Sequence, residues 1–96
     1  MRIHAAAAAA AVLAGSYAGL DRGEWLWVLA AIAFVICAEL INSALERIAD
    51  LAADGRRHPL VKAAKDMGAA AVLTAALFAL AVGAIVLLPA LIGKWS

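Results

Sequence analysis

The sequence predicts an all-α membrane protein whose three transmembrane helices pack as a helical bundle. Of its 96 residues, 68% are hydrophobic and only 16% are charged, whereas soluble domains are about half apolar and roughly a quarter charged. The apolar residues are concentrated in three segments that short polar stretches separate. A chain of this length makes one domain at most, so we expect residues 1–96 to form a single membrane domain.

The three apolar segments, residues 5–20, 25–45 and 68–92, differ in how well they suit a bilayer. A helix needs ~20 residues to cross ~30 Å of hydrocarbon, and the second and third segments meet that requirement. The first is short and alanine-rich, and its small residues, including Gly15 and Gly19, suit close packing against other helices. It also resembles a signal peptide. A retained first helix is the simpler interpretation, because the apolar run passes smoothly into a second spanning segment.

Lysine and arginine residues predict the orientation of the chain. The first loop carries only Arg22. The second loop carries five basic residues: Arg47, Arg56, Arg57, Lys62 and Lys65. The positive-inside rule therefore places the second loop in the cytoplasm, with the N-terminus inside and the C-terminus outside. The net charge is +1, without a basic stripe, so nucleic acid is not an expected partner.

Polar side chains form a stripe along the second predicted helix. The stretch CAELINSALERIAD carries Glu39, Asn42, Ser43, Glu46 and Asp50. At about 100° per residue these positions fall within about 100° of arc and climb from the membrane toward water. An ionisable residue inside a membrane is costly and indicates function, and Glu39 lies well inside the predicted boundary. For Asp50, a helix end that has reached the interface explains the pattern as well.

A second polar group follows the turn after this helix, where Gly55 and Pro59 break the helical pattern. Lys65 and Asp66 then precede the third apolar segment, and Asp66 can cap that helix or lie in its first turn. Free N–H groups at a helix start, together with the Lys65 ammonium, would bind an anion. Glu46 and Asp50 would face this site from the second helix, and their carboxylates would suit Mg²⁺. Plain capping and snorkelling of Lys65 remain an alternative on spacing alone.

Two motifs on these segments carry a resemblance to a known family. E-L-I-N-S-A-L-E-R-x-x-D begins at Glu39, and H-P-L-x-K-x-A-K-D-M-G-A-A-A-V-L begins at His58. With R-I-H at Arg2 and E-W at Glu24, they resemble the small prokaryotic diacylglycerol kinases, which include undecaprenol kinases. The resemblance implies a homotrimer of three-span protomers that phosphorylates the primary hydroxyl of a membrane lipid alcohol with ATP and Mg²⁺. The absence of a GxxxxGK[ST] motif agrees, because this family is unrelated to P-loop kinases.

The resemblance also implies a role for each residue of the stripe. Glu39 would be the general base that takes the proton of the lipid hydroxyl, and Asn42 and Ser43 would orient groups beside it. Glu46 would bind the metal ion and the nucleotide. Further nucleotide contacts would come from both sides of the turn: Asp50, His58, Lys65 and Asp66. A three-span protomer encloses a site poorly, so we expect active sites shared between neighbouring protomers.

One departure from the family concerns the segment before R-I-H. Family members usually carry an amphipathic surface helix there, which supplies a second metal-binding glutamate. This sequence begins at Met1-Arg2, so we expect either a start further upstream or a reduced form with a depleted metal site. The departure affects the expected activity more than the expected fold.

The leading interpretation is therefore a lipid kinase of the bacterial cytoplasmic membrane. Diacylglycerol is slightly favoured over undecaprenol as substrate, because A-K-D-M-G-A-A-A-V-L resembles the diacylglycerol type, although H-P-L and Pro89 resemble the undecaprenol type. The alternative is a small proton-coupled transporter, or a non-catalytic membrane assembly protein, that uses Glu39 as its intramembrane acid. That alternative leaves the cytoplasmic acid and lysine cluster without an explanation.

Overall fold

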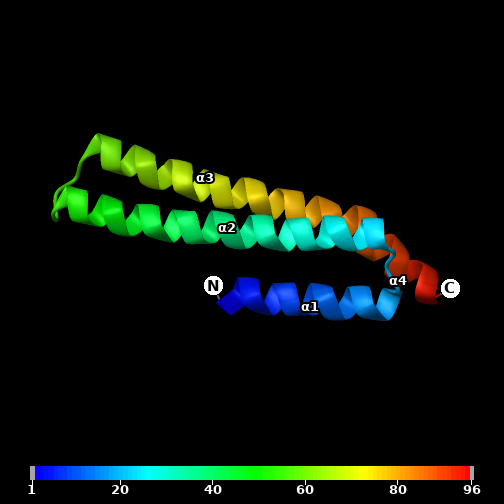
Figure 1. The fold of residues 1–96 in the computed structure, drawn as a ribbon. Coiled ribbons are helices and arrows are strands. Elements are labelled where there is room, and N and C mark those ends of the chain that lie inside the picture. Colours follow the sequence, from blue (N-terminus) through cyan, green and yellow to red (C-terminus); the bar gives the residue numbers. More distant parts are fainter. Residues whose placement is uncertain (1, 96) are drawn as a thin grey trace.

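The computed structural model describes residues 2–95, except for the side chains of Arg2 and Trp95, and this part of the chain is entirely helical and loop. Its elements in order are α1 (Arg2–Ala18), α2 (Arg22–Ala53), α3 (Pro59–Val82), the π-helical turn Gly83–Leu87, and α4 (Leu88–Trp95). Figure 1 shows α2 and α3 running antiparallel side by side, with α1 beside the part of α2 that lies away from the 54–58 turn. The predicted all-α class is confirmed.

Two helices are long and apolar enough to cross a membrane within the described chain, Arg22–Ala53 and Pro59–Lys94. α1 has 17 residues and is shorter than such a span, so the predicted third crossing stays a prediction. The molecule measures 57 × 19 × 18 Å, and its long axis exceeds the ~30 Å of a hydrocarbon core. The polar ends of α2 and α3 therefore extend beyond the apolar layer.

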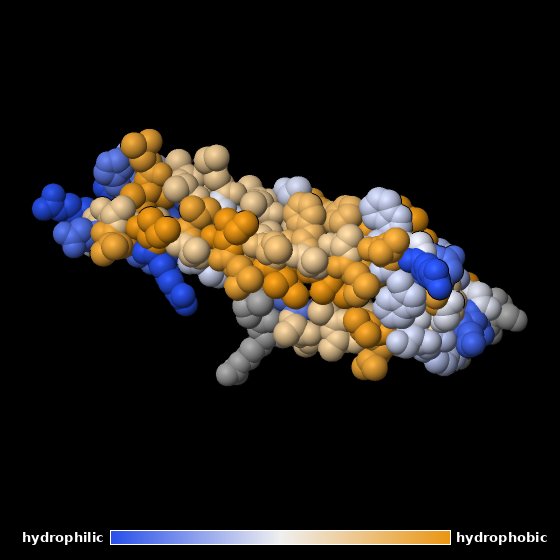
Figure 2. All heavy atoms as spheres, in the orientation of Figure 1, coloured by the Kyte–Doolittle hydropathy of each residue, from blue (hydrophilic) through white to orange (hydrophobic). Residues whose placement is uncertain are grey.

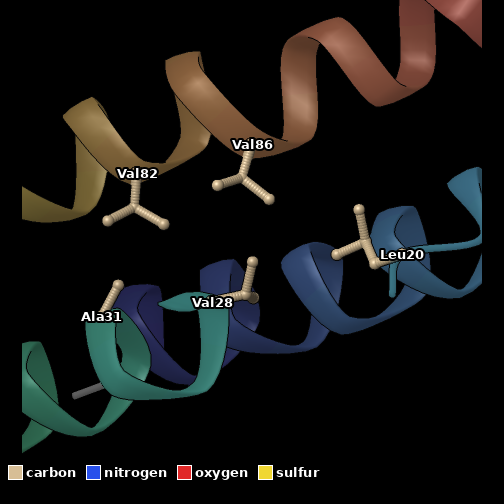
Figure 3. Packing of buried hydrophobic residues seen from close by; sticks show 5 residues of the cluster. All are labelled: Leu20, Val28, Ala31, Val82 and Val86. Carbon is tan, nitrogen blue, oxygen red and sulfur yellow. The ribbon is translucent and has the colours of Figure 1, made fainter. Parts of the chain in front are cut away.

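Packing among the helices is thin, and most large apolar side chains face outward. A small cluster is buried where the α1–α2 turn, α2 and the end of α3 meet, as Figure 3 shows: Leu20, Val28, Ala31, Val82 and Val86. Exposed apolar side chains line every long helix, among them Leu13, Leu29 and Leu73. Figure 2 shows hydrophobic residues over the middle of the molecule and hydrophilic ones gathered toward its ends. This distribution suits a chain surrounded by lipid.

The close packing predicted for small residues of the first helix is confirmed within the protomer for Gly15, whereas Gly19 makes no such contact there. A Cβ on Gly15 would lie 2.9 Å from a ring atom of Trp25, so only glycine permits this approach of α1 to α2. A Cβ on Gly19 would meet nothing within 4 Å, and its φ of +71° serves to end α1 instead. Asp21 then caps α2 and exchanges two hydrogen bonds with Glu24.

The predicted start of the third helix is wrong. α3 begins at Pro59, a residue suited to the first helical position. His58 caps it through Nδ1, which accepts a hydrogen bond of 3.2 Å from the Leu60 N–H. Asp66 is therefore neither a cap nor part of the first turn, and Lys65 does not lie beside the free N–H groups. The helix begins early because alanine, leucine and lysine favour helix whether or not they suit lipid.

A π-helical turn carries the third long helix past Pro89. Proline lacks an N–H and its ring clashes with the carbonyl of the residue four positions before it. The Leu88 N–H donates to the carbonyl of Gly83, five residues back, which widens the helix just ahead of the proline. The chain thus continues as helix to Trp95.

Candidate functional site

Glu39 lies on α2 at a depth that a membrane would cover. At 1.5 Å per residue it is ~21 Å along the helix from Trp25, within the ~30 Å of a hydrocarbon core. Its side chain is only 19% exposed, and Oε2 lies 3.8 Å from Nδ1 of His4 in the first turn of α1. The two meet because α1 runs antiparallel to α2, with its N-terminal end beside the middle of α2 (Figure 1).

Asn42 lies one turn further along α2 and packs directly against α3. Its Oδ1 is buried without a hydrogen-bond partner. A Cβ on Gly68 would overlap this oxygen and lie 3.4 Å from Asn42 Cγ. The glycine is therefore what lets α3 approach the amide. Ser43, the other residue predicted to orient substrate, is half-buried on the same stripe.

Toward the 54–58 turn, the predicted nucleotide residues of the two helices meet. Lys65 on α3 donates through Nζ to Asp50 Oδ1 on α2, and the two form an ion pair. This hydrogen bond raises the pKa of Lys65, and the negative charges of Asp50 and Glu46 act in the same direction. Glu46 is exposed. The lysine thus stays an ammonium within reach of two carboxylates.

The remaining predicted residues lie at the same end of the molecule. Asp66 Oδ2 accepts a hydrogen bond of 2.8 Å from Lys62 Nζ, an exposed pair along α3. His58 caps α3 and lines, with Lys65, a surface hollow of about 920 Å³. Most of the charged groups around this hollow are basic, and two are acidic: Arg56, Arg57, Lys62, Lys65, Asp50 and Asp66. An anionic ligand would suit this lining.

The predicted residues therefore form two groups joined along α2. Eleven residues separate Glu39 from Asp50, which is ~16 Å along the helix axis. Glu46 falls between them on the same face. The structure brings Asp50 and Lys65 together as predicted, while the carboxylate of Glu39 is next to His4. A ligand that touches both groups must be elongated.

The donor set can be compared with the needs of Mg²⁺. No group of three or more His, Cys, Asp or Glu side chains within the described residues could hold a metal ion. Mg²⁺ commonly uses one or two carboxylates and completes its shell with phosphates and water. Glu46, with Asp50 one turn away, fits an ion that arrives with a nucleotide. It does not fit one held by protein side chains alone.

Two residues of this site escaped prediction. His4 stood out only as part of R-I-H, although a titratable side chain in an alanine-rich apolar helix is itself a signal. In the sequence, Gly68 is one of several small residues in an apolar run. The contact that requires a glycine comes from Asn42 on another helix.

Comparison with known proteins identifies the family. A model described as prokaryotic diacylglycerol kinase matches residues 1–87. The undecaprenol kinase of Bacillus subtilis is 39% identical over 90 residues, which cover 94% of this chain and 72% of that protein. The diacylglycerol kinase of Synechocystis sp. is 38% identical over 91 residues, which cover 95% of this chain and 52% of that protein. No solved structure matches the chain. These similarities confirm the predicted family and enzyme class, and the chain belongs to the prokaryotic diacylglycerol kinase family of lipid kinases.

Proposed function

We propose that this chain is the protomer of an ATP-dependent kinase that phosphorylates the primary hydroxyl of a membrane lipid alcohol. The order of groups along α2 carries the proposal: Glu39 at membrane depth, Glu46 two turns further out, and Asp50 joined to Lys65 at the polar end. A lipid hydroxyl stays near the headgroup layer, so its base must lie at that depth. A water-soluble nucleotide must reach the same place from the polar end.

The chemistry follows from this order. Glu39 takes the proton of the lipid hydroxyl while the alkoxide oxygen bonds to the γ-phosphorus, and the bond to the β-phosphate oxygen breaks to release ADP. Lys65 binds the phosphates, together with Arg56 and Arg57 of the same hollow. Asn42 Oδ1, buried without a partner, can accept a hydrogen bond and orient a group beside Glu39. Glu46 would hold Mg²⁺, which neutralises phosphate charge when the nucleotide binds.

Assembly and orientation belong to the same proposal. The protomers form a homotrimer in the bacterial inner membrane, with the N-terminus and the 54–58 turn in the cytoplasm and the C-terminus outside. The exposure of Glu46 and Asp50 in one protomer supports sites shared between neighbours, since a nucleotide bound there would be open to water on one side.

For the acceptor lipid we place diacylglycerol before undecaprenol. The support is the stretch A-K-D-M-G-A-A-A-V-L at the start of α3. The two relatives named above act on one lipid each by name, and their identities to this chain, 39% and 38%, favour neither.

The test of this function is the binding of MgATP to the purified protein in micelles. We expect saturable binding that Glu46→Gln weakens, because the substitution removes the proposed metal ligand and keeps the shape. Asp54→Asn is the matched control: it removes one exposed carboxylate near the same end, at a left-handed cap that asparagine tolerates. If MgATP did not bind, while Glu39→Gln abolished proton-driven efflux, the chain would be a transporter instead.

A further inference from the structure

Among the described residues, His4 is the one polar side chain along an otherwise apolar groove. The groove has a volume of about 610 Å³ and runs between α1, α2 and the α3–α4 helix. Alanine, valine, isoleucine, leucine and glycine make up the rest of the described lining. An imidazole at such a position adds polarity where the rest of the groove avoids it, so its presence calls for a partner.

Glu39 is the partner that the fold brings to His4. The imidazole Nδ1 is buried without a hydrogen bond, and Glu39 Oε2 lies 3.8 Å away. The side chains are 29% and 19% exposed. A buried polar nitrogen without a partner costs free energy. A movement of less than about 1 Å would bring this pair within the 2.7–3.2 Å of an N–H···O hydrogen bond.

We propose that His4 is a positioning residue for Glu39. During turnover its Nδ1–H donates to Glu39 Oε2, which fixes that oxygen and leaves Oε1 free to take the proton of the lipid hydroxyl. This inference rests on the function proposed above. Hydrogen bonds to a carboxylate are among the stronger ones, and catalytic hydrogen bonds that are long in a ligand-free site tighten when substrate binds.

The kinetic test compares two substitutions of His4. His4→Leu removes the donor, and we expect kcat to fall about 10- to 100-fold with little change in KM for ATP or lipid, because a misplaced base affects the chemical step. His4→Asn keeps an N–H donor close to the position of Nδ1 and should recover most of the lost kcat. Ala6→Leu, an exposed position on the same helix, is the matched control for added bulk and should leave kcat unchanged.

Two kinetic results would overturn the inference. One is a His4→Leu variant with the kcat of the wild type. The other is an equal loss in His4→Leu and His4→Asn, which would mean that the imidazole ring serves packing and not hydrogen bonding.

A spectroscopic measurement separates this inference from the proposed function. In bilayers that contain diacylglycerol, the ¹⁵N spectrum of histidine-labelled protein distinguishes a protonated Nδ1 from an unprotonated one. The chain has two histidines, so the His4→Asn spectrum assigns the signals. We expect a protonated Nδ1 on His4 whose resonance moves in Glu39→Gln. An unprotonated or unmoved Nδ1 would refute the contact, whereas absent lipid phosphorylation with the contact present would refute only the function.

Discussion

The two halves of the candidate site satisfy their polar groups in opposite ways. Near the 54–58 turn, the lysines and carboxylates are exposed and paired: Lys65 with Asp50 and Lys62 with Asp66. In the half that a membrane would cover, His4 Nδ1 and Asn42 Oδ1 are buried without hydrogen bonds. We call the charged residues near the 54–58 turn the outer half of the site, and Glu39, His4 and Asn42 the inner half. The outer half resembles an ordinary solvated helix surface, and the inner half does not.

This difference indicates which part of the fold leaves buried polar atoms without hydrogen bonds. A buried polar atom without a partner is rare in proteins and calls for an explanation, such as a catalytic role. Exposed ion pairs are common and contribute little to stability. Glu39 is the proposed partner of His4, and Asn42 Oδ1 remains without a partner within the described residues, so substitutions in the inner half should change turnover. Substitutions in the outer half should change nucleotide affinity or nothing.

The largest effect is expected from Glu39→Gln. The variant keeps the shape of the side chain and loses the base, and general-base catalysis contributes about 10²–10⁴-fold. Turnover should fall by that factor or more, while oligomer size and MgATP affinity stay close to wild type. Phosphoryl-transfer rates, light scattering and calorimetry check the three quantities. A variant that failed to assemble would make Glu39 structural.

A smaller loss is expected from Gly68→Ala. The added Cβ overlaps Asn42 Oδ1, so the amide must move or α3 must shift, at a cost of about 1–3 kcal/mol. We expect kcat to fall about tenfold and the free energy of unfolding to fall by that cost.

Gly93→Ala is the control for Gly68→Ala, because a Cβ there meets nothing within 4 Å. Activity and thermal unfolding of both variants check the expectation. If the two variants had equal activity and equal thermal stability, the close contact between Gly68 and Asn42 would have no role in turnover.

Lys65→Ala should act on the nucleotide alone. Loss of one charge-assisted contact to phosphate should raise KM for ATP roughly 10- to 100-fold and leave KM for the lipid unchanged. Lys94→Ala makes the same chemical change at the opposite end of the molecule and should alter neither. A parallel rise in both KM values for Lys65→Ala would contradict a phosphate role.

The smallest effect is expected from Lys62→Ala. Its partner Asp66 is one turn away on the same exposed face of α3, and exposed pairs of this kind contribute little to stability. The midpoint of thermal unfolding should move by a few degrees at most. A stability loss far larger than this would show that the outer half is not a simple solvated surface.

Hydropathy and helical periodicity in the sequence were enough for the helical class and for the polar stripe of α2. Glu39, Asn42 and Glu46 could be placed on one face because a long helix has a fixed rotation per residue. The same reasoning put Lys65 and Asp50 near each other across the turn, and the structure confirms that pair.

What could not be predicted depended on contacts between helices or on helix ends. α3 starts at Pro59 because the residues that follow it favour helix, although they are too polar to belong to the apolar segment. Two contacts depend on the relative axial position of neighbouring helices. They are the contact of His4 with Glu39 and the contact of Gly68 with Asn42 Oδ1. Sequence spacing within one helix carries no information about that distance.

The most direct test of the central claim is phosphoryl transfer from [γ-³²P]ATP to diacylglycerol and to undecaprenol in mixed micelles. We expect labelled product from at least one lipid, diacylglycerol first, and loss of that product in Glu39→Gln. Protein that binds MgATP and labels neither lipid would contradict it.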